Sequence, residues 1–503
     1  MMKSKIITML LCLALPVAAN AMEFQSIGAL GIGGAGVART TDAYASYWNP
    51  AGLAFYEKPF SAKLNAGAGI NINSTLADDI DKLGKLNLND LQNLTFTNTA
   101  NTAANAAVTA QAVEFVGIIN DLNHNQGTLT VTADPTLAFQ YRNFGLGGFV
   151  SGELASFANA DTTNVRPGDP TNVSIVSFGQ GIGALDAVGN PNPTTPGTLF
   201  STSQRSNIVA AFTTANPAFS AQQATAIVNT LEAQLQQGDK TGQTSQQLAD
   251  ALIHMAQSFG TGNSIQNNLS TLEYRGIILT DIPIAYGHKF DLKEFGQIAI
   301  GGSIKVMQGR TFASYSQIVK VNSSGDIVKN ITDRYVDSTN VGLDLGALWR
   351  YRNMLNVGVV AKNLNSPEFD MPQFTTLQNT RFNQKVRVDP QVRMGVAVDP
   401  LSWLSIAADA DLTRNSTLLP GRDSRNVGGG LDLHPLSWFA LRAGMYSNLA
   451  ESSTGPVGTF GLTFGPKWLR MDIDGAVAFE TAKYKDSTYP REARVEFGMS
   501  TMF

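Results

Sequence analysis

The sequence predicts an all-β transmembrane protein, a barrel of about fourteen antiparallel strands. In the last eleven residues, apolar side chains such as Val495 and Phe497 alternate with Arg494 and Glu496. This period of two is that of a strand with one apolar face and one polar face. The chain also begins with a secretory signal. Only 15% of its residues are charged, yet no apolar run after Ala21 reaches the roughly 18–20 residues that a membrane helix needs.

Residues 1–21 are predicted to be a signal peptide. Lys3 and Lys5 precede an apolar run, and small residues ending at Ala21 form a cleavage site, so the segment is excluded from the fold. The only cysteine, Cys12, lies within this segment. The mature chain, from about Met22, therefore has no disulfide and no thiol nucleophile. We expect it in the bacterial outer membrane after cleavage near Ala21.

The fourteen strands follow from segments in which apolar and polar residues alternate. In one of them Val341, Leu343 and Leu345 share a face and Asp344 lies on the other. A soluble sandwich would alternate too, but the signal peptide and the terminal strand favour a barrel with lipid outside and a charged lumen. The predicted strands are 60–72, 128–142, 144–157, 271–289, 296–315, 336–351, 354–364, 385–399, 402–414, 424–434, 437–449, 456–465, 467–480 and 490–503.

The connections between the strands are alternately short and long. Tight turns lie near Asn143, Asn353 and Pro466, and longer loops lie between them. This asymmetry is expected of short periplasmic turns and long external loops, and an even strand number places both termini in the periplasm. Within the barrel domain, 60–503, two loops are far longer than the others, and we predict external insertions at 73–127 and 158–270.

Both insertions are predicted to contain helices. The first has Phe115 and Ile119 on the apolar side of one helix, and Ser220 and Thr244 are N-caps for helices near 221–237 and 245–259. A helix with an apolar stripe must bury it. Two interpretations remain open, a cap packed over the barrel mouth and an apolar vestibule that first captures a ligand.

Four of the five tryptophans, namely Trp349, Trp403, Trp438 and Trp468, lie within a few residues of predicted periplasmic turns. Only Trp349 has lipid-facing parity. The other three either belong to an interfacial aromatic girdle or pack against whatever fills the lower end of the barrel.

Residues 22–59 precede the first strand and are not strand-like. They are rich in glycine, and the spacing of Gly31, Gly33 and Gly36 fits the dinucleotide-binding fingerprint. That motif needs a preceding strand, and here it starts ten residues after a cleavage site, which argues against a nucleotide-binding fold.

A glycine-rich start, the pair Asp42-Ala43 and the core Asn49-Pro50-Ala51 just before the first strand resemble the FadL family of outer-membrane transporters. Within that superfamily the chain is most similar to the branch named for the barrel-type conjugal transfer protein TraF. The acidic helical segment 76–83 contributes to this similarity. The resemblance implies a fourteen-stranded barrel with an N-terminal hatch, residues 22–59, folded into the lumen. The hatch residues would be Gly33, Gly34, Gly36, Asp42, Asn49, Pro50, Ala51 and Gly52.

Buried hatch amides need hydrogen-bond partners. Charged residues on the lumen side of the predicted strands could supply them, and the candidates are Arg387, Arg393, Asp409, Asp432, Arg442 and Asp472. The alternative is that these charges line a water-filled channel.

Glycines in the third strand mark a candidate opening in the wall. Glycine weakens a strand ladder and allows bulges, and this strand contains Gly145, Gly147, Gly148 and Gly152. In the resembled family a kink in the third strand opens the wall sideways, so we expect a lateral opening here.

No enzyme is predicted. The four histidines lack metal-ligand spacing and no catalytic motif occurs, so we expect no catalytic residue, no metal and no cofactor. The mature chain has 34 basic and 40 acidic residues, which gives no support for nucleic-acid binding. The resemblance implies passive uptake of hydrophobic small molecules from a barrel surrounded by outer-membrane lipid. The alternatives are a structural or interaction component of the conjugation machinery and, more weakly, a degraded carboxylate hydrolase.

Overall fold

The computed structural model describes residues 25–73, 75–94, 102–125, 127–169, 171, 173–237, 244–320, 334–375, 377, 381–382, 385–419, 421–466, 468–484 and 487–503. The predicted signal peptide, 1–21, and the first three residues of the predicted hatch lie outside these ranges.

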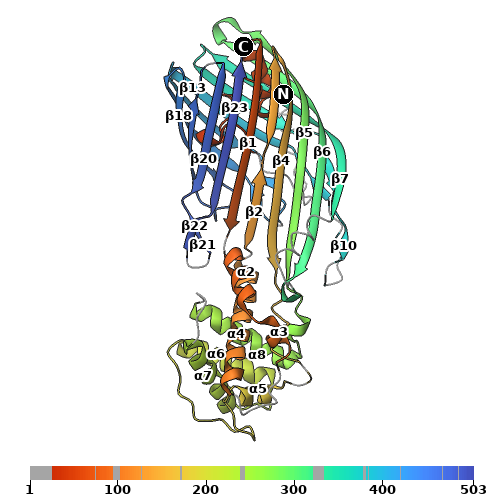
Figure 1. Ribbon diagram of the computed structural model, residues 1–503, viewed down its shortest axis with the longest axis vertical. Helices are drawn as coiled ribbons and strands as arrows, with labels where there is room; N and C mark the ends of the chain where they lie inside the picture. The colour runs from red at the N-terminus through yellow and green to blue at the C-terminus, as the bar shows by residue number, and fades with distance from the viewer. Residues whose placement is uncertain are drawn as a thin grey trace, which may run out of the picture.

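Strands form one antiparallel sheet that closes on itself as a barrel with fourteen wall positions (Figure 1). The first strand pairs with the last along eleven residues, with Leu64 opposite Met499. The wall consists of β1 (Phe60–Asn73), β2 (Thr128–Ala133), β3 (Thr136–Tyr141), β4 (Phe144–Asn159), β5 (Thr271–Asp291), β6 (Gln297–Gln317), β7 (Tyr335–Tyr351), β8 (Leu355–Lys362), β13 (Gln391–Leu401), β14 (Leu404–Asp411), β17 (Asn426–Leu436), β18 (Phe439–Asn448), β19 (Val457–Phe464), β20 (Leu469–Ala478) and β23 (Glu492–Met502).

β2 and β3 occupy a single position in the wall. Both pair with β1 and with β4 in one continuous register, and only Asp134 and Pro135 separate them. Proline lacks the N–H that a ladder needs, which explains the interruption. The predicted fold class, a barrel of about fourteen antiparallel strands, is confirmed.

The outside of the barrel is apolar and its inside is polar. On β7, Val341, Leu343 and Leu345 are exposed while Asp344 is buried, because successive side chains point to opposite faces. The same alternation recurs on β23, where Val495 and Phe497 face outward and Glu496 is buried. An exterior of this kind matches the hydrocarbon region of a bilayer.

One predicted strand is wrong in its first part. The segment 385–399 was expected to be continuous, but β12 (Lys385–Arg387) pairs with β9 (Glu368–Asp370), and the wall strand starts only at Gln391. Val386 and Val388 are 0% and 2% exposed, because this hairpin folds into the lumen instead of facing lipid. Further short hairpins are β10 (Phe374–Thr375) with β11 (Arg381–Phe382), β15 (Asn415–Ser416) with β16 (Asp423–Ser424), and β21 (Thr481–Tyr484) with β22 (Ser487–Pro490).

The two long insertions form a separate group of helices beyond one end of the barrel (Figure 1). We call this group the helical module, the adjacent end of the barrel the helical end, and the opposite end, where both described termini lie, the terminal end. The helices of the helical module are α2 (Leu76–Lys85), α3 (Leu88–Gln92), α4 (Thr102–Asn125), α5 (Ile175–Gly181), α6 (Thr202–Ala215), α7 (Ala221–Gln237) and α8 (Ser245–Thr261). Short 3-10 turns flank them and the wall at η4 (Ile265–Asn267), η5 (Lys293–Phe295) and η6 (Ile318–Lys320).

The apolar stripes of these helices pack against one another. Phe115 and Ile119 of α4 share one core with Phe212 of α6 and Leu252 of α8. The side-chain oxygen of the predicted cap Thr244 accepts a hydrogen bond from the Gln247 backbone amide, and Gln247 Oε1 accepts one from the Thr244 backbone amide, so α8 begins with a capping box. The module therefore buries its own apolar surface. None of the helices in the described ranges is both long and apolar enough to cross a membrane.

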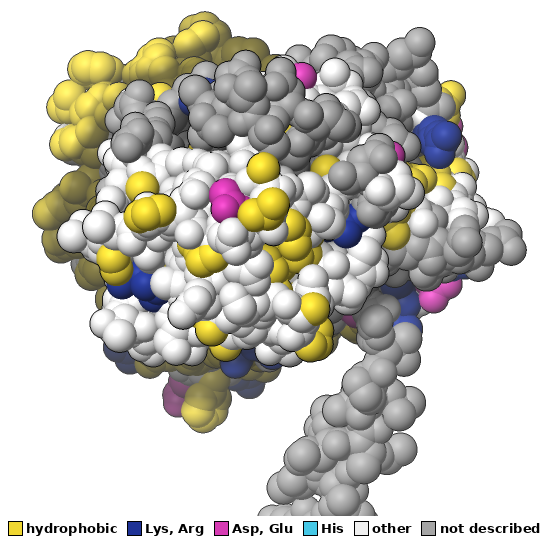
Figure 2. Space-filling view, turned by 90° about the horizontal axis from the view of Figure 1, so that it is seen from below, with side chains coloured by type: hydrophobic (Ala, Val, Ile, Leu, Met, Phe, Trp, Pro, Cys, Tyr) yellow, Lys and Arg dark blue, Asp and Glu magenta, His cyan; other side chains and the backbone are white. Residues whose placement is uncertain are grey.

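The surface of the helical module carries few charges. Figure 2 views the molecule from the helical end and shows mostly uncharged side chains there. Residues 158–270 contain only six acidic and three basic residues, which accounts for this surface.

Tryptophans near the terminal end lie on turns and are exposed. Trp403, Trp438 and Trp468 have about half of their surface accessible, at 48%, 54% and 58%. This exposure favours the interfacial girdle over packing inside the lumen.

Candidate functional site

The hatch fills the lumen near the terminal end, and its centre is Asn49. It is built from η2 (Leu30–Ile32), α1 (Ala45–Trp48) and η3 (Pro50–Phe55), and these residues are buried. The side-chain oxygen of Asn49 accepts a hydrogen bond from the Ala51 amide at 3.1 Å, which caps η3, and Pro50 occupies its first position. The Asn49 amide nitrogen donates to the carbonyl of Val37 at 3.2 Å and to that of Ala347 in β7 at 3.1 Å. One side chain thus joins two parts of the hatch to the wall.

A row of wall glycines receives this part of the hatch. Gly287, Gly301 and Gly346 lie directly opposite one another on β5, β6 and β7. A Cβ atom on Gly301 would lie 2.3 Å from the Ala51 amide nitrogen, and one on Gly346 would lie 2.0 Å from Asn49 Oδ1. Only glycine lets the two backbones approach this closely. We call this row the glycine seat. None of its three glycines is among the residues predicted above to contact the hatch.

The glycine-rich turn of the hatch meets a second set of wall glycines. Gly33 has φ +66°, and its amide donates to Thr459 Oγ1 at 3.1 Å. A Cβ on Gly428 of β17 would lie 2.0 Å from the Gly33 carbonyl oxygen, and one on Gly444 of β18 would lie 2.7 Å from its nitrogen. The turn is therefore fixed to β17 and β18 by backbone contact.

Other predicted hatch glycines are needed within the hatch itself. A Cβ on Gly36 would overlap the ring of Trp48, and one on Gly52 would lie 2.3 Å from the Thr40 carbonyl oxygen. Gly34 differs, because a Cβ there would have room and only its positive φ of +71° favours glycine.

Charged wall residues bind hatch backbone groups. Asp409 Oδ2 accepts hydrogen bonds from the amides of Gly36 and Val37 at 2.8 and 2.9 Å. Arg393 donates to the Gly34 carbonyl at 3.0 Å and lies 3.5 Å from Asp409. Such charge-assisted bonds, made away from water, are strong.

The remaining candidate lumen residues are distributed differently. Asp432 pairs with Arg39 of the hatch. Arg442 pairs with Asp472 and, at 3.3 Å, with Asp474, so these wall residues neutralise one another beside the hatch. Arg387 lies in the inward hairpin instead, where it binds Asp389 at 2.8 Å.

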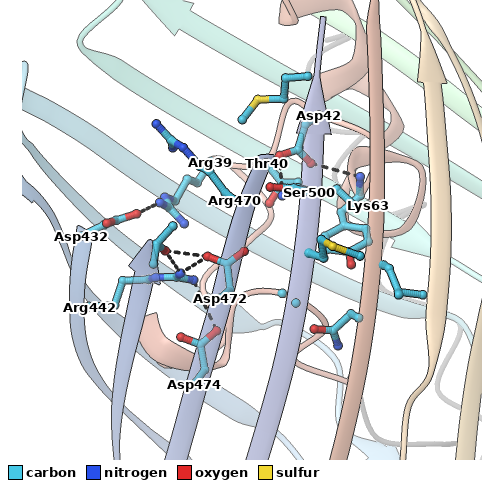
Figure 3. A pocket seen from close by; sticks show the side chains of 18 of the residues that line it. Arg39, Thr40, Asp42, Lys63, Asp432, Arg442, Arg470, Asp472, Asp474 and Ser500 are labelled. Carbon is cyan, nitrogen blue, oxygen red and sulfur yellow. Dashed lines mark hydrogen bonds and ion pairs between the residues drawn. The ribbon is translucent and has the colours of Figure 1, made fainter. Parts of the chain in front are cut away.

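Arg39 and the wall residues paired beside it, Asp432, Arg442, Asp472 and Asp474, line a cavity of about 200 Å³ at the terminal end (Figure 3). Asp42 lies there and pairs with Lys63 of β1 at 2.6 Å. Arg470 lines the same cavity, and Figure 3 shows it near Arg39 and Asp472. The cavity is thus walled by paired charges immediately outside the hatch.

The glycines of β4 occupy both faces of the wall. Gly145 faces the hatch, where its Cβ would lie 2.9 Å from that of Ser46, and Gly147 lies against the ring of Phe149. Gly148 faces open space on the outside, and a Cβ on Gly152 would lie 3.3 Å from the Ala133 carbonyl oxygen. Phe149 stacks on Tyr47 of the hatch at 5.2 Å.

The β4–β5 ladder has a local gap at two of these glycines. Pairing runs from Phe144 to Leu146 and resumes at Phe149, leaving Gly147 opposite Pro283 and Gly148 opposite Ile282. Pro283 cannot donate a hydrogen bond, which contributes to the gap. The register is the same on both sides, so the wall is weakened here but not displaced.

Towards the helical end, one half of the lumen is apolar. Ile277 and Leu279 of β5 and Met307 of β6 pack against Phe369 and Val386 of the inward hairpin. Leu418 and Leu419 of the loop between β14 and β17 complete this group, which we call the apolar cluster.

A layer of ion pairs separates the apolar cluster from the hatch. Lys305 lies on β6 between Gly301, which touches the hatch, and Met307, which belongs to the cluster. Its Nζ is 2.9 Å from Asp281 and 3.4 Å from Asp344, and all three are largely buried. Nearby, Lys362 lies 3.4 Å above the ring of Tyr47.

Comparison with known proteins places the chain in one family. A family model described as "F plasmid transfer operon, TraF, protein" matches residues 46–411. No curated protein matches the chain.

Several solved structures are similar over almost the whole chain at low sequence identity. The toluene transporter TbuX of Ralstonia pickettii is 10% identical, with a TM-score of 0.46 over 96% of this chain and 99% of that one. The toluene transporter TodX of P. putida is also 10% identical, with a TM-score of 0.44 over the same shares. A FadL homologue of Pseudomonas aeruginosa is 10% identical, with a TM-score of 0.40 over 97% of this chain and 98% of that one.

Proposed function

The chain belongs to the family described as "F plasmid transfer operon, TraF, protein", and we propose that it acts in the outer membrane as a hatch-gated channel for passive uptake of small hydrophobic molecules. The apolar exterior supports the location, with the terminal end in the periplasm and the helical module outside the cell. The expected membership of the TraF branch is confirmed by the family match.

The apolar cluster is the observation that carries the uptake proposal. It lines the inner face of β5 and β6 below the helical module, where a polar lumen surface would be the ordinary arrangement of a barrel. Part of it, including Phe369 and Val386, comes from a hairpin of three-residue strands. An apolar solute can replace the apolar contacts of this hairpin and so displace it from the wall.

The ion-pair layer around Lys305 and the hatch form the barrier between the apolar cluster and the terminal end. A hydrophobic solute cannot replace the partners of buried charges, so it passes only when hatch and layer move. Gly147 and Gly148 supply the exit that we propose, because the ladder to β5 is already open there. The solute would then enter the surrounding lipid sideways.

Gating by the hatch can be tested with one disulfide. The only natural cysteine, Cys12, lies in the predicted signal peptide, so a double variant Ser46→Cys/Gly145→Cys has a single possible pair in the mature chain. The two Cβ atoms would start 2.9 Å apart and must separate by about 1 Å to reach disulfide geometry. In a deletion strain, uptake of a hydrophobic fluorescent probe should fall several-fold with the oxidised variant and recover with dithiothreitol.

Each single cysteine variant serves as the control for that test. Each should import the probe at the same rate under oxidising and reducing conditions, because neither can form the cross-link. Equal uptake by the oxidised and reduced double variants, with the cross-link verified by mass spectrometry, would remove the hatch from the mechanism.

The lateral exit has its own test in β4. Gly147→Val and Gly148→Val together should abolish uptake, because valine favours a closed ladder and crowds the Phe149 ring. Gly152→Val, in the continuous part of the ladder, is the matched control. Wild-type uptake by the double variant would exclude this exit.

A second function is favoured by the way the hatch is held. Asn49, Asp409 and Arg393 bind it through buried hydrogen bonds, and the helical module with its own core extends from the barrel. A plugged barrel that presents such a module suits a structural or interaction component of a conjugation apparatus. A deletion strain that loses mating efficiency but imports hydrophobic probes normally would establish this role in place of uptake.

A further inference from the structure

Gly498 of β23 forms a hollow in the wall of the terminal-end cavity. In the sheet it lies directly between Asp472 of β20 and Asn65 of β1, and all three residues line the cavity. A Cβ atom on Gly498 would lie 3.4 Å from Asp472 Oδ2 and 3.6 Å from Asn65 Oδ1. Both oxygens can therefore accept hydrogen bonds from one donor held between them. We call this space the Gly498 hollow.

The side chain of Asn65 points into the hollow and is not satisfied by the protein. Asn65 is only 2% exposed, and within the described ranges its Nδ2 atom has no hydrogen-bond partner. Buried polar groups of folded proteins are almost always bonded to the protein, to water or to a ligand. Asn65 therefore marks the hollow as the place of a polar molecule.

Asp472 contributes a carboxylate oxygen to the same hollow. Its Oδ1 atom accepts hydrogen bonds from Arg442 and from the Thr463 hydroxyl, whereas no residue in the described part of the chain donates to Oδ2. Arg442 also pairs with Asp474 at 3.3 Å, so one guanidinium group serves two carboxylates. An excess of negative charge beside two acceptor oxygens suits an ammonium group, which donates three hydrogen bonds.

The next inward row of the wall places a hydroxyl group between two cations. Ser500 of β23 lies opposite Arg470 of β20 on one side and Lys63 of β1 on the other (Figure 3). Ser500 is 5% exposed and lines the cavity, and its hydroxyl bonds to none of the described residues. Arg470 donates to the Ser437 carbonyl at 3.4 Å, which is longer than an ordinary hydrogen bond. This row suits a carboxylate group.

The charges of the whole cavity favour a ligand without net charge. Four cations and four carboxylates line it, namely Arg39, Lys63, Arg442, Arg470, Asp42, Asp432, Asp472 and Asp474. Arg470 is the exception to the pairing, because it has no ion pair with any residue that the structure describes, while Arg442 serves two carboxylates. A zwitterion provides a second cation for the shared carboxylates and an anion for Arg470. A simple anion or cation provides only one of these.

We propose that this cavity binds a small amino acid as a zwitterion, with its ammonium group in the Gly498 hollow and its carboxylate at Ser500. The two rows lie two residues apart, which is roughly 7 Å along a strand. Two carbon atoms between the charged groups, with a hydrogen bond at each end, span this distance. Thr40 and Thr41 of the hatch line the same cavity, so the ligand lies between hatch and wall. It is a different class of ligand from the hydrophobic solutes of the apolar cluster.

β-Alanine, propionate and ethylamine test the proposal, because propionate lacks the ammonium group of β-alanine and ethylamine lacks its carboxylate. Binding to the purified full-length protein in detergent is titrated by saturation-transfer difference NMR. β-Alanine should bind with a dissociation constant of about 1 mM. Propionate and ethylamine should each bind at least tenfold more weakly, because each leaves one of the two rows without its partner.

Gly498→Ala tests the hollow directly. The added methyl group fits, because its closest neighbour would be Asp472 Cβ at 3.2 Å, but it occupies the position of the ammonium group. β-Alanine binding should weaken at least tenfold. Gly302→Ala on the outer face of β6, where a Cβ would lie 3.3 Å from Leu345, is the matched control and should bind β-alanine as the wild type does.

Ser500→Ala tests the carboxylate position. It should weaken β-alanine binding several-fold and leave ethylamine binding unchanged, because ethylamine has no carboxylate. Thr501→Ala is the matched control, since the Thr501 hydroxyl donates to the Trp468 carbonyl instead of facing the cavity.

Heat-modifiable migration on gels verifies that each variant barrel is folded. Three results would each overturn the proposal: no binding of β-alanine to the wild type, equal binding of propionate or ethylamine, and unchanged β-alanine affinity in Gly498→Ala or Ser500→Ala. None of these results depends on the uptake of hydrophobic probes.

Discussion

At the scale of single residues, the glycines of the wall hold the hatch as firmly as the hydrogen bonds do. Gly287, Gly301 and Gly346 remove side chains from three neighbouring strands at the level where Pro50 and Ala51 lie. Because the wall and hatch backbones are in direct contact here, few flexible side chains could move aside to make room for a larger residue. The position of the hatch therefore depends on the lack of side chains at these three wall positions.

Gly301→Val should expel this part of the hatch, since its Cβ would lie 2.3 Å from the Ala51 nitrogen. Overpacking at such a site costs on the order of 3 kcal/mol. Limited trypsin digestion after Arg39, which lies in the hatch and pairs with Asp432, should then accelerate at least tenfold. Gly302→Val, whose Cβ would have as its nearest neighbour the flexible Leu345 side chain on the outer face at 3.3 Å, should keep the wild-type pattern. Equal digestion of the two variants would show that the seat does not hold the hatch.

At the scale of elements, two carboxyl groups join the first helix of the module to its neighbours. The Thr75 hydroxyl lies 2.7 Å from Asp79 of α2 and 3.0 Å from Asp121 of α4, and Gln247 of α8 donates to Asp121 at 2.8 Å. A hydroxyl has one proton to donate, so both contacts are satisfied only when one carboxyl group is protonated. Burial, and the nearby charge of Asp121, raise the pKa of Asp79 to about 7 against a lowering by Thr75 and Lys82.

This raised pKa makes the packing of α2 pH-dependent. The folded module retains a proton on Asp79 that the unfolded chain releases near its ordinary pKa of about 4, so its stability is highest below that value. The stability is lost progressively as the pH rises from about 4 to about 7, by on the order of 4 kcal/mol in total. Asp79→Asn should remove most of this dependence, with Asp90→Asn in exposed α3 as the control. The melting temperature of each protein is measured at pH 5 and pH 8 by the helical circular dichroism signal. An equal change in melting temperature between the two pH values for wild type and Asp79→Asn would contradict this assignment.

At the scale of the whole molecule, the barrel was predictable because its signal is local. The wall strands were predicted to within a few residues, except for the segment 385–399, since each strand carries its own period of two and its own turns. The inward turn of Val386 was not predictable in this way. It depends on contacts with Ile277 and Phe369, which are distant in sequence and provide an apolar surface inside the lumen.

The hatch partners show the same limit at the level of the site. Asp409 and Arg393 lie on regular strands, so their inward direction follows from parity, whereas Arg387 lies where the strand pattern fails. The glycine seat had a usable signal, because Gly287, Gly301 and Gly346 all occupy inward positions. Recognising it requires the register between strands, which alternation within one strand does not supply.

The pairing of β1 with β23 has a consequence for how the protein is made. The hatch precedes β1 in the chain, yet its partner Asp409 is 373 residues from Gly36. Most of the chain must therefore be synthesised before the hatch can bind Asp409. The barrel closes only when β1 pairs with β23, which join the two ends of the wall. During assembly the hatch has to enter the lumen before β1 and β23 pair, and a barrel that closed earlier would leave the hatch outside.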